Sequence, residues 1–194
     1  MENGIRKMTR MKGRRYKSVP LICDGTLCGH DYETCPSELI GNGVELVVIL
    51  GEAPYRDEIA KQRPFIGKTG RILDQYLNLD YYKYLIMNSI MCKPHDTKKN
   101  KPTEELIKNC RPVREDLMRM MEDGDIIVAF GRFAQLAIFG QHMDFSEVPY
   151  FIEHPTKGFE IPVWVCFHPM APQYNPSLQD RFEDILRATG KFKI

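Results

Sequence analysis

An unbroken apolar run at residues 46–50, LVVIL, constrains the fold of this chain more than any other feature. Such a run is typical of a strand that is buried on both faces, as in a parallel sheet covered by helices. The run stops at Gly51 and is followed at once by a carboxylate, Glu52. Because ligands of open α/β sheets bind in the crevice outside the carboxyl ends of the strands, we expect a binding site where this strand ends.

Strand-type runs alternate with helical patterns along the rest of the chain. Strands are expected at 44–50, 84–90, 125–130 and 161–167, and helices at 69–79, 103–121, 132–139 and 178–188. This order predicts an α/β fold with three layers, α/β/α, around a central, mainly parallel four-stranded sheet. Residues 141–160 are interpreted as a looser connection. Since 194 residues, 43% of them hydrophobic, can bury one sizeable core, we expect one domain at 21–194 after a basic, flexible tail at 1–20.

Positive charge gathers at the N-terminus although the net charge is only +1. Residues 1–17 hold seven Lys and Arg residues against one acid, Glu2. Such a segment is either a solvated tail or an arm that contacts a polyanion such as DNA. No apolar run reaches the ~18 residues of a membrane span, and the N-terminus lacks the apolar centre of a secretory signal. We therefore expect an intracellular protein, in which the six cysteines do not form three disulfides.

A turn at 63–67 and a helix at 103–121 place further candidate site residues near this sheet. A turn at 63–67 presents an aromatic ring, Phe65, beside the end of the first strand. A carboxylate and a ring that converge at a sheet end indicate a pocket for a flat, polar molecule. The helix at 103–121 has Thr103 as its cap, and its apolar period points Cys110 inward. Pro112 is expected to kink or interrupt this helix just past Cys110.

Five short motifs occur in order along the chain. They are GEAP at 51–54, PFIGKTG at 64–70, Asn88 followed by CKP at 92–94, NCRP at 109–112 and FHP at 167–169. Together they resemble the uracil-DNA glycosylase superfamily, most closely the thermophile-type family 4 enzymes with an iron–sulfur cluster, and also its phage polymerase-associated members. The resemblance covers about residues 23–188. It implies a monofunctional hydrolase that cuts the N-glycosidic bond of flipped-out uracil in DNA.

The resemblance also assigns roles to side chains at the strand ends. Glu52 matches the acid that orients the attacking water, and His168 matches the histidine that stabilises the leaving uracil anion. Phe65 matches the ring that stacks on uracil. Asn88 matches the amide that reads the uracil edge, since an amide offers both a donor and an acceptor. Taken alone, each residue also has a structural interpretation, such as a turn cap for Glu52.

Two departures from the family pattern bear on the base and on the DNA. The substrate loop that contains Gly51 and Ala53 continues with Tyr55, where the family usually has glycine. A tyrosine at this place in another branch of the superfamily excludes the 5-methyl group of thymine, so Tyr55 is either such a gate or a side chain turned to solvent. After the histidine the usual serine is missing, and Met170 is the candidate wedge into DNA while Tyr174 is a candidate for stacking.

The cysteines match the family's cluster ligands only in part. By resemblance, Cys92 and Cys110 are the third and fourth iron ligands, whereas the close N-terminal pair of the family is absent. We predict that Cys23, Cys28, Cys92 and Cys110 hold a 4Fe–4S cluster of structural role. Cys35 is the rival for either N-terminal place, and a structural zinc site or simple buried thiols are the alternatives. Cys166 is interpreted as a core residue.

Other functions remain open at this stage. The expected partner is uracil-containing DNA, with replication or repair proteins as further candidates, no membrane and a monomeric state. One alternative is a non-catalytic DNA-binding or replication accessory module on the same fold, which the altered segment after His168 favours. Another is an iron–sulfur redox or sensor protein. No motif-matched lysine stands ready for Schiff-base chemistry, although Lys68 lies near the pocket loop, so no strand nicking is expected.

Overall fold

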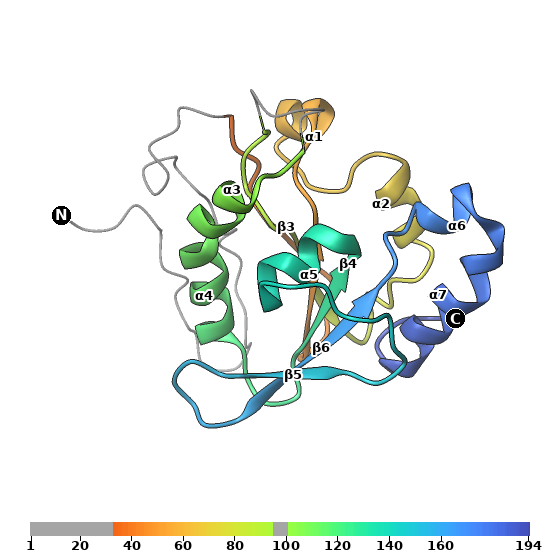
Figure 1. Ribbon diagram of the computed structural model, residues 1–194. Helices are drawn as coiled ribbons and strands as arrows, with labels where there is room; N and C mark the ends of the chain where they lie inside the picture. The colour runs from red at the N-terminus through yellow and green to blue at the C-terminus, as the bar shows by residue number, and fades with distance from the viewer. Residues whose placement is uncertain (1–32, 95–100) are drawn as a thin grey trace.

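The computed structural model describes residues 33–94 and 101–194 and shows a sheet flanked by helices (Figure 1). The predicted tail at 1–20 and the predicted ligands Cys23 and Cys28 lie outside these residues. The sheet has six strands in the order β1-β3-β2-β4-β6-β5. Their bounds are β1 Glu38–Ile40, β2 Leu46–Gly51, β3 Lys83–Asn88, β4 Ile126–Phe130, β5 Tyr150–Glu153 and β6 Glu160–Cys166.

The four inner strands β3, β2, β4 and β6 are all parallel, as the sequence predicts. The predicted count of four strands is wrong, because β1 and β5 add an antiparallel strand at each edge. These edge strands are only three and four residues long. In β5, which lies inside the supposed loose connection, exposed and partly buried residues alternate. A short, half-exposed strand carries no continuous apolar run, so the pattern that identifies buried strands does not detect it.

Seven α-helices and one short 3₁₀ turn are found in the described residues. They are α1 Arg56–Lys61, α2 Lys68–Leu73, α3 Glu104–Asn109, α4 Arg111–Met120, α5 Gly131–Phe139, α6 Ala171–Tyr174, the 3₁₀ turn Pro176–Leu178 and α7 Gln179–Ala188. Helices α4 and α5 pack on one face of the sheet, and α2 and α7 pack on the other (Figure 1). The three-layer prediction is confirmed.

The strand β2 shows why the layers form. Its side chains alternate between the two faces, so that Val48 and Leu50 enter the core under α4 and α5 while Val47 and Ile49 enter the core under α2 and α7. All of β2 is buried. This double burial explains the unbroken apolar run in the sequence.

The predicted helix at 103–121 is two helices in the structure. Thr103 caps α3 by accepting the N–H of Leu106 at 3.2 Å, as expected of a capping threonine. The break falls at Cys110, between α3 and α4, and Pro112 lies in the first turn of α4. Proline is accommodated there because the first helical N–H groups have no partner inside the helix. The break therefore comes just before Pro112, and Cys110 is buried as predicted.

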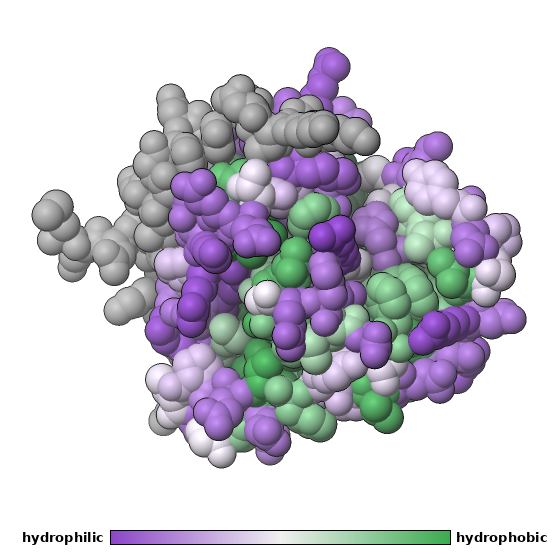
Figure 2. Space-filling model, viewed as in Figure 1, coloured by the Kyte–Doolittle hydropathy of each residue, from purple (hydrophilic) through white to green (hydrophobic). Residues whose placement is uncertain are grey.

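The outer surface on the α5 side mixes hydrophilic and hydrophobic areas. Figure 2 shows hydrophobic residues gathered over α5, between the hydrophilic surfaces of the neighbouring helices. Leu136, Ile138 and Phe139 on α5 are only partly buried. Among the described residues, no helix is long and apolar enough to cross a membrane.

Candidate active site

A cavity of about 690 Å³ opens where the inner strands end. Glu52 follows β2, Asn88 is the last residue of β3, and His168 comes two residues after β6. Because these strands are parallel, their carboxyl ends meet at one edge of the sheet. The cavity is lined by most of the residues that the sequence predicted for the site, namely Glu52, Ala53, Tyr55, Phe65, Asn88 and His168, and also by Met170 and Tyr174.

The ring of Phe65, which lines the cavity, lies close to Gly51 at the end of β2. A Cβ atom placed on Gly51 would lie 2.4 Å from the ring of Phe65 and 2.7 Å from Oδ1 of Asn88. Only glycine at position 51 leaves this space, so Gly51 contributes to the site by letting the ring and the amide come together. Gly70 makes room for the backbone of Phe65, since a Cβ on Gly70 would lie 1.4 Å from the carbonyl oxygen of Phe65.

The amide of Asn88 is presented at the end of β3, with only 5% of the residue exposed. Asn88 pairs with Gly51 in the β2–β3 ladder, and Ser89 then donates its N–H to the carbonyl of Gly51 at 2.9 Å. Within the described part of the chain, no hydrogen bond engages the Asn88 side chain. Its donor and acceptor groups are therefore available to a ligand in the cavity.

His168 presents one ring nitrogen to the cavity as a donor. Its Nδ1 accepts the backbone N–H of Met170 at 3.2 Å, so the neutral ring carries its proton on Nε2. Burial lowers the pKa of His168, and the nearby Glu52 opposes this shift. Gly131 has a φ of +79° and lies against the start of the His168 side chain, since a Cβ on Gly131 would be 3.3 Å from Cβ of His168. The arrangement favours a neutral imidazole that donates from Nε2.

Glu52 accepts hydrogen bonds from Tyr55, which the sequence placed at the site, and from Lys101, which it did not. The hydroxyl of Tyr55 donates to Oε1 of Glu52 at 3.0 Å, and Nζ of Lys101 donates to the same oxygen at 2.8 Å. Lys101 also lies 3.3 Å from the Tyr55 hydroxyl oxygen. Burial lowers the pKa of Lys101, but its contacts with Glu52 and Tyr55 outweigh this and raise it above the usual value. Lys101 ends the basic loop at 93–101, which is the only sequence signal for it.

Tyr55 lines the cavity although 42% of the residue is exposed. Its hydroxyl is anchored on Glu52, so the side chain is not simply turned to solvent. Burial raises the pKa of Tyr55, and the negative charge of Glu52 adds to this shift. The hydroxyl therefore stays protonated and acts as a donor.

Glu58 is a further residue of this site that the sequence did not suggest. Its Oε2 accepts the N–H of Tyr55 at 2.9 Å, and its Oε1 accepts the N–H of Phe65. Burial raises the pKa of Glu58, although these two backbone donors act in the opposite direction. The spacing from Tyr55 to Glu58 is that of the glutamate in a helix capping box, which could have signalled the first contact.

Cys92 and Cys110 lie in one buried cluster with Ile90, Leu106 and Ile107. Both cysteines are buried, at 3% and 4% exposure. Two thiols gathered in an apolar cluster suit the donor set of an iron–sulfur or thiolate zinc site. Among the described residues, no group of three or more potential metal ligands is assembled, and the other two predicted ligands lie outside that part of the chain.

Cys35 does not join this pair. The bridge partner of Cys92 is Thr34, and the N–H of Cys35 donates to the carbonyl of Met91 at 2.7 Å. Adjacent residues of an extended segment point to opposite faces, so Cys35 faces away from the side shared by Thr34 and Cys92. Burial, with the negative charges of Glu58 and Glu38, raises the pKa of Cys35 to about 12. Cys166 is a core residue as predicted.

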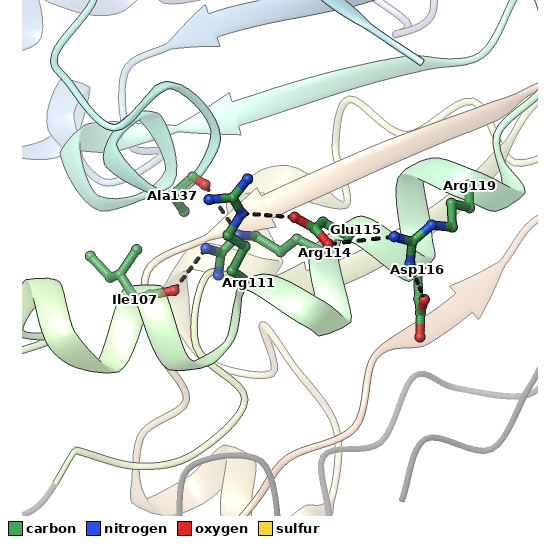
Figure 3. A network of polar contacts seen from close by, with 7 residues as sticks. All are labelled: Ile107, Arg111, Arg114, Glu115, Asp116, Arg119 and Ala137. Atoms are coloured by element: carbon green, nitrogen blue, oxygen red, sulfur yellow. Dashed lines mark hydrogen bonds and ion pairs between the residues drawn. The ribbon is translucent and has the colours of Figure 1, made fainter. Parts of the chain in front are cut away.

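A buried arginine, Arg114, links α4 to the backbone of α3 and α5, as Figure 3 shows for Ile107 and Ala137, and also to the segment that follows β3. Arg114 is 4% exposed and donates to three backbone carbonyls, those of Ser89 and Ile107 at 2.7 Å and that of Ala137 at 3.1 Å. Burial lowers its pKa to about 10, so it remains a cation at neutral pH. Arg114 was not among the residues predicted from the sequence, although its spacing of four residues from Cys110 places it on the same helical face.

Comparisons of the sequence with known proteins point to one family. Residues 41–190 match the family profile described as the Uracil DNA glycosylase superfamily. A type-4 uracil-DNA glycosylase of Archaeoglobus fulgidus is 30% identical over 164 residues, which is 78% of this chain and 79% of that protein. The type-4 uracil-DNA glycosylases of Sulfurisphaera tokodaii and Saccharolobus solfataricus are 30% and 28% identical, each over 76% of this chain and over 70% and 71% of their own lengths. The chain therefore belongs to the uracil-DNA glycosylase superfamily and, as a member, is a hydrolase that acts on N-glycosyl bonds.

Proposed function

We propose that this chain is a monofunctional uracil-DNA glycosylase that hydrolyses the N-glycosidic bond of uracil flipped out of DNA. The observation that carries the proposal is the meeting of Glu52, Phe65, Asn88 and His168 at one cavity at the carboxyl edge of the sheet. An acid, a ring, an amide and an imidazole donor are the groups that such a reaction needs. The names of the similar proteins point to the same substrate.

Base recognition is assigned to Phe65 and Asn88. A base in a duplex must leave the stack before an enzyme can reach its glycosidic bond. The Phe65 ring offers a flat surface for the extruded base, and the Asn88 amide beside it offers a donor and an acceptor to the edge of the base. Uracil and cytosine differ in the donor and acceptor pattern of that edge, so the orientation of this amide selects uracil.

Bond cleavage is assigned to His168 and Glu52. As the C1′–N1 bond breaks, its electron pair leaves with uracil, and the negative charge that develops on the uracil oxygen accepts a hydrogen bond from Nε2 of His168. Among the described residues, the donors to Glu52 are Tyr55 and Lys101, and both use Oε1, so we assign Oε2 to the attacking water. The water oxygen bonds to C1′ while its proton passes to the Glu52 carboxylate.

Tyr55 is assigned to exclusion of thymine. Its ring lines the cavity, and its hydroxyl is fixed by Oε1 of Glu52, so the ring has a defined position. A methyl group at the 5-position of the base would have to displace this ring. Replacement of Tyr55 by glycine should accordingly weaken discrimination against bases with a large 5-substituent.

The cavity mouth carries side chains suited to hold DNA. Met170 and Tyr174 line the cavity, and Tyr174 is 82% exposed. An apolar side chain that enters the space left by a flipped nucleotide, and a ring that stacks on a base, both stabilise extruded DNA. Positive charge for the DNA phosphates is supplied by Lys101 and by Arg132, of which Arg132 lies in the first turn of α5.

The same proposal includes a 4Fe–4S cluster bound by Cys92, Cys110 and the two cysteines Cys23 and Cys28. When bound, the cluster would supply cross-links between chain segments, and hydrolysis of a glycosidic bond requires no electron transfer from it. Burial of Cys92 and Cys110 in one cluster supports their assignment, and the opposite orientation of Cys35 disfavours it as a ligand. A thiolate zinc site is the alternative that metal analysis distinguishes.

Substitution of a cluster ligand should remove the metal. In protein purified without oxygen, Cys92→Ser or Cys110→Ser is expected to lower iron and sulfide content and the visible absorbance sharply, because each removes a thiolate ligand. Cys35→Ser is the matched control and should retain the iron, the sulfide and the visible absorbance. Full iron content in Cys92→Ser would contradict the assignment, and zinc without visible absorbance in the unaltered chain would favour the zinc site.

The function itself is tested by release of uracil from single-stranded and U·G duplex oligonucleotides. The unaltered chain should release uracil without nicking the strand, and Glu52→Ala should lose most of this activity because the water is no longer oriented. Asp180→Asn removes an exposed acid from α7 and should behave like the unaltered chain. Binding without release by the folded, metal-loaded protein would refute the glycosylase and favour a DNA-binding accessory module. Nicking of the strand would indicate Schiff-base chemistry, with Lys68 as the candidate lysine.

A further inference from the structure

Glu58 lies in α1, and its carboxylate accepts hydrogen bonds from the segment before this helix and from the segment after it. Tyr55 precedes α1 and Phe65 follows it, and both donate their backbone N–H to Glu58. The donors use different oxygens, Oε2 for Tyr55 and Oε1 for Phe65. A capping glutamate accounts for the first contact only. The second contact attaches the carboxylate to the segment that carries the stacking ring.

Phe65 needs such a restraint because its backbone conformation is unfavourable. It has a φ of +56° in the left-handed region, where residues other than glycine are strained and persist only if their surroundings hold them. Its ring is confined by Gly51 and its carbonyl by Gly70. Its N–H is held by the Glu58 carboxylate, which also accepts the N–H of Tyr55.

We propose that Glu58 is a positioning residue for base selection, whose carboxylate sets the separation between the Tyr55 and Phe65 segments and thereby the width of the slot that receives the base. The inference rests on the proposed function, since it concerns which bases that activity accepts. Glu58 acts through the two rings and need not contact the base. An ionised carboxylate suits this task because it offers two acceptor oxygens and no donor.

Glutamine at position 58 tests this role with almost no change in size. Its amide keeps one acceptor but turns an NH₂ group toward one of the two backbone N–H donors. One of the two segments must therefore move away. A displacement of about 1 Å in a positioning element can lower a rate by about a hundredfold, so we expect Glu58→Gln to lose about ten- to a hundredfold in kcat/KM for uracil.

The deciding readout is discrimination between bases. Single-stranded oligonucleotides that carry uracil or 5-bromouracil, whose substituent is about the size of a methyl group, are compared for the unaltered chain, Glu58→Gln, Glu58→Ala and Tyr55→Gly. Both Glu58 variants should shift the ratio of the two rates toward 5-bromouracil, in the same direction as Tyr55→Gly. Asp180→Asn, which removes a first-turn acid from α7, should leave the ratio unchanged.

A loss of folded protein lowers both rates equally and leaves their ratio unchanged, so the ratio separates positioning from stability. An unchanged ratio in Glu58→Gln, or an equal shift in Asp180→Asn, would overturn the inference. If Glu58→Gln releases neither base, calorimetric binding of free uracil and free 5-bromouracil gives the same comparison with the same criteria. Absence of uracil release by the unaltered chain would instead refute the proposed function.

Discussion

Replacement of His168 by alanine is expected to lower the rate of uracil release by about a hundred- to a thousandfold, the effect of removing one donor to a developing oxyanion. The Nδ1 atom is already occupied by the N–H of Met170, so the neutral ring of this cavity residue donates from Nε2. Binding of uracil-containing DNA should change much less, because the charge that Nε2 stabilises appears only as the bond breaks. Single-turnover kinetics with binding measured separately checks this prediction.

The pH dependence of release tests the protonation state of His168. Burial holds its pKa below the ordinary value of 6.5, so the ring is neutral at pH 7 and above. The rate should therefore not decline through loss of a proton from His168 as the pH rises from about 6.5 to 8. His142→Ala, which removes an exposed histidine, serves as the control for nonspecific effects. A decline over this range that disappears in His168→Gln would show that the cationic ring is the active form.

Replacement of Arg114 by methionine is expected to destabilise the protein by about 3–5 kcal/mol. Methionine fills part of the space but donates no hydrogen bond, and the carbonyls of Ser89, Ile107 and Ala137 would lose their partner. Each buried acceptor left without a partner costs about 1–3 kcal/mol. Urea unfolding of both proteins at equal metal content measures the difference.

Arg111 on the same helix provides the matched control. Its guanidinium pairs with Glu115 at 2.7 Å, but 74% of the Arg111 side chain is exposed (Figure 3). Exposed pairs of this kind contribute about 0.2–1 kcal/mol, so Arg111→Met should change the free energy of unfolding by less than about 1 kcal/mol. Equal effects of the two substitutions would show that burial of Arg114 does not decide its contribution.

Much of the site could be predicted because it lies at strand ends. Runs of apolar residues locate the inner strands, and parallel strands bring the residues that follow them to one edge. Glu52, Asn88 and His168 meet for this reason, although they are far apart in sequence. Their individual roles came from the family resemblance and stay proposals, since the strand ends give location and not chemistry.

Other features could not be read from one sequence. The edge strands β1 and β5 bury too little to leave an apolar run. Whether Cys35 could accompany Cys92 depended on which residue of the 33–35 segment lies opposite Cys92, and an isolated bridge between segments far apart in sequence sets that register. Pro112 predicted an interruption just past Cys110, whereas the break lies at Cys110 itself, because proline is tolerated in the first turn of the following helix.

The sequence by itself determined the inner strands, their parallel direction and the gathering of the acid, the amide and the imidazole at their ends, because burial on both faces imposes a visible apolar pattern. Only the tertiary structure decided how these groups are held. Glu58, Lys101 and Arg114 act through contacts with backbone atoms or with side chains distant in sequence. Backbone N–H and C=O groups are the same at nearly every residue, so no sequence pattern marks which of them a buried charge will meet.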